Sequence, residues 1–98
     1  MVTEIADFRV VSDRADAFAA AVEEGLEFVA ATPGFGSARL TRSIESPNRF
    51  VLIIEWESVE AHTEGFRGSE NFAKWRALVG PFFDGDPFVE HATTVVSR

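Results

Sequence analysis

His62 and Arg76 offer acid–base chemistry and a positive charge in the second half of this 98-residue chain. His62, in EAHTEG, carries an imidazole with an ordinary pKa of about 6.5, which can take a phenolic or α-keto proton near neutral pH. Arg76, in WRAL, carries a guanidinium that can stabilise negative charge developing on an enolate or phenolate oxygen. We predict catalytic roles for both. The alternative for each is an ordinary surface side chain.

Aromatic residues near these positions are candidates for holding an apolar ligand. Phe72 and Trp75 share one face of an expected helix, so each can be either a substrate platform or part of the core. His91 alternates with Val89 and Val95 along an expected strand and points to one sheet face. We predict that all three contact substrate, with a structural histidine as the alternative for His91.

Composition excludes several other classes of site and partner. The chain has no cysteine, so it has neither disulfides nor thiolate metal ligands. Its two histidines have no nearby carboxylate cluster, and no phosphate-binding or dinucleotide-binding loop is present, so we expect no metal and no cofactor. A net charge of −7 argues against nucleic acid and anionic membrane surfaces, and we interpret the acidic residues as a solvated surface. The amino-terminal MVTEIADFRVV lacks the features of a signal peptide, so we expect a cytoplasmic location.

The elements that must position these side chains follow from hydrophobic spacing and turn residues. No repeat or linker interrupts residues 1–98, so we expect one domain. Ser58 is placed to cap a short helix that reaches about Phe66. The expected order is β-α-β-β-α-α-β, an α+β ferredoxin-like antiparallel sheet with helices on one face. Its ranges are a strand at 3–11, a helix at 13–31, a hairpin at 37–56, helices at 58–66 and 69–79, and a strand at 88–96.

The segment FVLIIEWE at 50–57 predicts a strand that is apolar on both faces. Phe50, Leu52, Ile54 and Trp56 lie on one side, and Val51 and Ile53 lie on the other. Helices cover only one face of such a sheet, and a broad exposed apolar patch usually marks an interface or a binding surface. Because dimers with twofold symmetry are the commonest oligomers, we predict a homodimer in which two sheets pack face to face.

Three segments resemble the antibiotic biosynthesis monooxygenase domain: PGF at 33–35, FVLIIEWES at 50–58 and AHTEGFRGSENFAKWRALVG at 61–80. The resemblance implies a ferredoxin-like subunit and a dimeric α+β barrel. The family includes cofactor-independent oxygenases that convert anthrone-type intermediates to quinones. Other members degrade heme, act on quinols or process small signalling molecules.

The resemblance to the anthrone oxygenases carries over to individual positions. It implies that Trp56 lines the pocket and that Arg76 is the helix arginine followed by leucine. A pocket tyrosine six residues after the tryptophan falls on His62. A pocket histidine and a pocket asparagine fall near Thr41 and Leu52, so the polar pocket differs from that of the anthrone oxygenases.

The function expected from the resemblance is oxidation of an electron-rich phenol, hydroquinone or anthrone-like molecule by O2. The alternative is a non-catalytic dimeric module that binds an apolar small molecule. Heme degradation is disfavoured, because the axial histidine position falls on Arg76 or Trp75 and Gly65 replaces a tryptophan. The first strand also lacks the asparagine of that branch.

Overall fold

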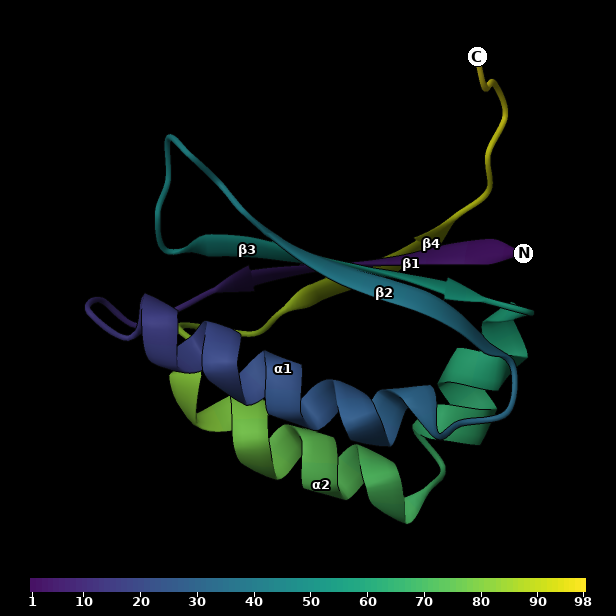
Figure 1. Cartoon of the computed structure of the whole chain (residues 1–98), viewed down its shortest axis with the longest axis horizontal. Coiled ribbons are helices and arrows are strands. Elements are labelled where there is room, and N and C mark those ends of the chain that lie inside the picture. The colour runs from purple at the N-terminus through teal and green to yellow at the C-terminus, as the bar shows by residue number, and fades with distance from the viewer.

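The strands of the computed structural model, which describes residues 1–98, form one antiparallel sheet in the order β2-β3-β1-β4. Helices α1 and α2 cover one face of this sheet, and the carboxyl-terminal segment rises on the opposite side (Figure 1). This arrangement confirms the predicted ferredoxin-like α+β class. The elements are β1 Val2–Arg9, α1 Ala15–Ala30, β2 Phe35–Arg42, β3 Arg49–Trp56, η1 Ala61–Phe66, α2 Glu70–Val79, η2 Gly80–Phe82 and β4 Phe88–Ala92.

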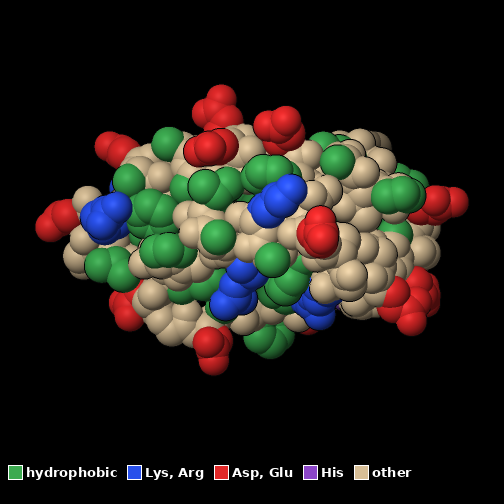
Figure 2. All heavy atoms as spheres, turned by 90° about the horizontal axis from the view of Figure 1, so that it is seen from below, with side chains coloured by type: hydrophobic (Ala, Val, Ile, Leu, Met, Phe, Trp, Pro, Cys, Tyr) green, Lys and Arg blue, Asp and Glu red, His purple; other side chains and the backbone are tan.

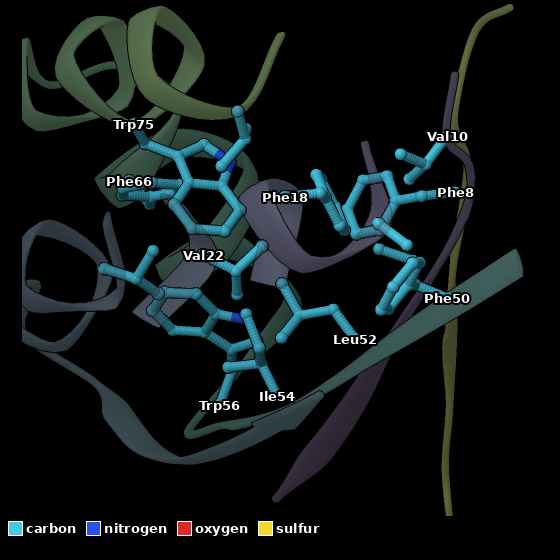
Figure 3. Close-up of a cluster of buried hydrophobic side chains, with 14 residues drawn as sticks. Phe8, Val10, Phe18, Val22, Phe50, Leu52, Ile54, Trp56, Phe66 and Trp75 are labelled. Atoms are coloured by element: carbon cyan, nitrogen blue, oxygen red, sulfur yellow. The ribbon is translucent and has the colours of Figure 1, made fainter. Parts of the chain in front are cut away.

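The core lies between the sheet and the helices. Alternate residues of β3 are buried, as expected for a strand whose inner face meets a helix layer. Residues of α1 spaced by three or four, among them Phe18, Val22 and Val29, are buried against them. In Figure 3, Phe8, Phe18 and Phe50 gather toward one end of the cluster, and Trp56, Phe66 and Trp75 gather toward the other.

The two long helices approach closely at Gly25 of α1. A Cβ atom at this position would lie 2.7 Å from Cε3 of Trp75 on α2, so only glycine leaves room for the indole. Trp75 is thereby held between the helices with 6% of its surface exposed. This contact fixes the side of α2 that faces the sheet.

The helical segment after β3 begins as the sequence predicts. The Ser58 hydroxyl oxygen accepts a 3.1 Å hydrogen bond from the Ala61 amide, which satisfies a free N–H of the first turn. The segment then widens into the π-helical turn η1, a feature often found at functional sites. The turn buries His62 and Phe66 on its inner side.

The last strand is shorter than the predicted 88–96, because β4 ends at Ala92. Its partner explains the difference: Thr3 of β1 pairs with Ala92, and β1 begins at Val2, so only one residue of β1 lies beyond this pair. The first strand also ends earlier than predicted, at Arg9, and Val10 makes only an isolated bridge to Phe83.

The outer face of the helix layer carries dispersed charge. Figure 2 shows acidic side chains mostly around the margin, basic side chains nearer the middle, and no histidine on this face. Neither long helix combines the length and apolar character needed to cross a membrane.

Candidate active site

A cavity of about 400 Å³ opens between the sheet and the helical layer. Its floor comes from β1 and β3, through side chains that include Ala6, Leu52 and Ile54. Residues of α1, η1 and α2 cover it, and the segment that leads into β4 completes its rim. Most lining residues are hydrophobic, as is usual for a pocket that binds a small organic molecule.

Four polar side chains, Glu4, Trp56, His62 and His91, form a connected cluster beside this cavity, which we call the Glu4 network. The Trp56 indole N–H donates a 2.9 Å hydrogen bond to Oε1 of Glu4. The same oxygen lies 3.3 Å from Nε2 of His62. Nδ1 of His62 is hydrogen-bonded to Nε2 of His91 at 2.8 Å. The network therefore links β1, β3, η1 and β4.

Local packing holds His62 in a fixed orientation. Its ring stacks on the Trp56 indole, with centroids 5.5 Å apart, and the Phe66 ring lies beside both, 6.4 Å from His62 and 6.1 Å from Trp56. Phe66 follows His62 by one π-helical turn, so η1 brings both rings to the same inner side. The register of β1 against β4 places His91 directly opposite Glu4.

Burial dominates the electrostatics of the network. It raises the pKa of the Glu4 carboxyl above 4.5, while the Trp56 hydrogen bond and the positive charge of Arg67 act in the opposite direction. Burial, followed by the charges of Arg67 and His91, lowers the pKa of His62 from 6.5 to about 4. His62 is thus neutral near pH 7, unlike the half-titrated imidazole expected from an ordinary pKa.

Two arginines line the cavity with no carboxylate within ion-pair distance of either. Arg67 follows η1 and Arg76 lies on α2, and both are exposed at their outer side. The Arg76 guanidinium lies 5.4 Å from the centre of the Phe83 ring, which keeps it over the apolar rim. The two arginines therefore offer free positive charge to an anionic group in the cavity.

The structure brings most of the predicted site residues to one place, but it distributes them differently from the prediction. His62, Phe72, Trp75 and Arg76 line the cavity. Trp56 does not: it is fully buried behind the cavity and contacts Glu4 and His62 instead of forming a wall. His91 also lies outside the lining and reaches the site only through His62.

Two functional candidates, Glu4 and Arg67, were not predicted from the sequence. Glu4 had a detectable signal: it shares its strand face with Ala6, Phe8 and Val10, an apolar row in which a carboxylate is out of place. Its 5% exposure corrects the interpretation of every acidic residue as solvated surface. Arg67 had no such signal, because no periodicity marks the residue that ends η1.

The donor atoms available do not form a metal centre. No group of three or more histidine, aspartate or glutamate side chains has an arrangement that could hold a metal ion. His62 uses both ring nitrogens inside the Glu4 network.

Comparison with known proteins agrees with this architecture. The family model for antibiotic biosynthesis monooxygenase matches residues 1–78. A Bacillus subtilis protein of uncharacterised function, YczJ, is 33% identical over 91 residues, which cover 93% of this chain and 96% of YczJ. A crystal structure from Bordetella bronchiseptica, provisionally described as an antibiotic biosynthesis monooxygenase, is 37% identical with a TM-score of 0.94, covering 97% of each chain.

A third relative shares the fold at lower identity. SnoaB, a cofactor-independent oxygenase from Streptomyces nogalater, is 20% identical with a TM-score of 0.83, covering 98% of this chain and 94% of SnoaB. The family match and the two closer relatives fix the identification. The chain belongs to the antibiotic biosynthesis monooxygenase family.

Proposed function

We propose that this protein is a cofactor-independent monooxygenase that oxidises an electron-rich phenol, hydroquinone or anthrone-like small molecule with O2. One observation carries the proposal: an apolar cavity of about 400 Å³ holds a buried carboxyl–imidazole pair together with two arginines that lack carboxylate partners. This combination provides a base, an anion anchor and mostly apolar walls.

The reaction needs little from the protein because the substrate supplies the electrons. A base removes a proton, the resulting anion gives an electron to O2, and the radical pair combines to an oxygenated product. The Glu4 network supplies the proton acceptor, and Arg76 stabilises the anion. The aromatic side chains Phe72 and Trp75 hold the rings of the substrate in the apolar part of the cavity.

Family membership supports the reaction type but not the substrate. SnoaB is described as a cofactor-independent oxygenase, and its likeness to this chain concerns the fold. The positions implied for anthrone oxygenases carry Thr41 and Leu52 here, so the polar groups that would orient an anthrone differ. We therefore extend the substrate class to smaller phenols and hydroquinones.

Oxygen consumption tests the proposal directly. Purified protein is incubated with a panel of hydroquinones, naphthols and anthrone in buffer treated with chelator, with no added flavin, and O2 is followed with an electrode. Catalysed uptake with at least one compound is expected. Saturable binding without O2 uptake would instead identify a binding module, and a heme spectrum that changes with ascorbate and O2 would favour heme degradation.

We also propose that the working unit is a homodimer formed through the open face of the sheet. Ile5, Val51 and Ile53 form an apolar row on that face, with the Ile5–Ile53 pair in direct register. Beyond β4 the chain continues past the sheet with Val95 and Val96 exposed at 87% and 85% (Figure 1). Such apolar surface favours association with a second copy.

A further inference from the structure

We propose that Glu4 is the catalytic residue that takes the proton from the substrate and later returns it. In this scheme Trp56, His62 and His91 are positioning residues that hold the carboxylate. The inference rests on the proposed function for its substrate class, but it assigns the acid–base role to a residue that the sequence did not single out.

The two oxygens of Glu4 have different surroundings. Oε1 accepts the Trp56 hydrogen bond and faces His62. Every fully buried side-chain oxygen or nitrogen has a hydrogen-bond partner, but Oε2 has none within the chain. Oε2 is therefore not fully buried. Since Glu4 lines the cavity, Oε2 is the atom that opens onto it. A carboxylate held through one oxygen and open at the other has the geometry of a general base.

His62 is not placed to contact the substrate through nitrogen. Nδ1 is hydrogen-bonded to His91, and Nε2 lies 3.3 Å from Oε1 of Glu4, so a substrate would compete with these partners for either nitrogen. The Trp56 and Phe66 rings pack against the imidazole, so a rotation that freed either nitrogen would break these contacts. His62 therefore acts through Glu4.

An ionised Glu4 also selects the proton arrangement on the two histidines. When His91 Nε2–H donates to His62 Nδ1, the His62 proton lies on Nε2, where it faces Oε1 of Glu4. The opposite tautomer would place the Nε2 lone pair against the carboxylate. His91 thus fixes the tautomer of His62, and His62 with Trp56 stabilises the ionised carboxylate.

Glu4 accepts and returns each proton that the reaction transfers. A substrate C–H or O–H proton passes to Oε2 and leaves its electron pair on the substrate. The anion reduces O2 and forms a C–O bond as a peroxide anion, which takes the proton back from Glu4. For a CH2 substrate, Glu4 then removes the second proton as the O–O bond breaks, and passes it to the departing hydroxide. The products are a ketone and water.

The pH dependence of this step involves every charged group near the carboxylate. Trp56 from β3, His62 and Arg67 from the η1 segment, and His91 from β4 surround Glu4. Arg76 and Asp86 line the same cavity farther along its wall. The proposed base therefore titrates in a net positive environment once His62 is neutral.

Deuterium exchange tests the assignment without requiring oxygenation. Anthrone is incubated with the protein in D2O under argon, and incorporation of deuterium at its CH2 carbon is followed by mass spectrometry. We expect the wild-type protein to accelerate exchange above buffer, and Glu4→Gln, which preserves size and the acceptor for Trp56, to lower the acceleration about 10²-fold or more. Glu23→Gln removes an exposed carboxylate from α1, away from the cavity and from the open face of the sheet, and should change nothing.

Variants of His91 separate positioning from structure and do not disturb the buried core. His91→Leu removes the donor to His62 and should move the pH profile of exchange, whereas His91→Gln retains an N–H donor and should restore the wild-type profile. Exchange by Glu4→Gln at the wild-type rate, or no wild-type acceleration, would overturn the assignment. Exchange that depends on Glu4 without any O2 uptake would leave Glu4 as a base and refute the oxygenase instead.

Discussion

The Trp56 indole N–H lies 2.9 Å from Oε1 of Glu4, and both side chains are buried on the inner face of the sheet, Glu4 on β1 and Trp56 on β3. In sequence they stand 52 positions apart, and the antiparallel register brings their strands together. The contact makes the tryptophan a hydrogen-bond donor to the proposed base and not a wall of the cavity. It also gives a side chain outside the cavity a way to influence the proposed chemistry.

Replacement of Trp56 by Phe should raise the pKa of Glu4. The indole N–H stabilises the carboxylate form, so its loss adds to the effect of burial, which already raises the pKa of Glu4. The rising limb of the pH–rate profile should shift to higher pH. The free energy of unfolding should fall by about 1–3 kcal/mol. Trp75→Phe makes the same change at an indole that does not contact Glu4, and an equal shift there would contradict the role of the hydrogen bond.

The neutral state of His62 should appear in the pH dependence of stability. Folding lowers the pKa of His62 from 6.5 to about 4, so the unfolded chain binds the proton first as pH falls. Protonation of His62 in the unfolded chain therefore costs no stability above pH 6.5. Between pH 6.5 and about pH 4 it lowers the free energy of unfolding progressively, by up to about 3 kcal/mol. Urea unfolding across this range should show a steeper loss for wild type than for His62→Gln. Parallel curves would mean that the ring is not buried as a neutral group.

The sequence predicts the frame of the site better than its chemistry. Alternation in β3 and three-to-four spacing in α1 depend on burial, which leaves a repeating signature in the chain. The end of β4 depends instead on where β1 begins, which no pattern within residues 88–96 records. This is why the predicted strand continues past Ala92.

The roles of the polar residues depend on contacts between distant segments. His62 and Arg76 could be selected by residue type, and the structure places both on the cavity. Their surroundings could not be selected in this way: the low pKa of His62 results first from burial and then from Arg67 and His91. Glu4 is the instructive omission, because its position in an apolar row distinguishes it from the solvated acidic residues.

Arg76→Ala should weaken the binding of anionic ligands more than that of neutral ones. Arg76 lines the cavity and has no carboxylate partner, so its charge is available to a phenolate oxygen. Calorimetry with 4-nitrophenolate should show a loss of about 1–3 kcal/mol, the scale of a charge-assisted hydrogen bond. Nitrobenzene, which has a similar shape but no charge, should bind almost as before.

A matched control for this experiment removes a cation elsewhere on the protein. Arg39 is exposed on β2 and does not line the cavity, so Arg39→Ala removes one positive charge, as Arg76→Ala does, without touching the site. Equal losses for Arg39→Ala and Arg76→Ala would indicate a long-range charge effect. Equal losses for the charged and the neutral ligand would assign Arg76 to packing against Phe83.

Ile53→Asp should dissociate the proposed homodimer. Ile53 lies on the open face of β3, opposite Ile5 of β1, so the substitution introduces a charge into the apolar row without entering the core beneath the helices. Burial of a carboxylate between two sheets, even beside Arg39 opposite it on β2, costs several kcal/mol, which is enough to shift a micromolar dimer to monomer. Sedimentation velocity at micromolar concentration should show a dimer for wild type and for Ala73→Asp on the exposed side of α2, and a monomer for Ile53→Asp. A wild-type monomer under these conditions would refute face-to-face packing of the sheets.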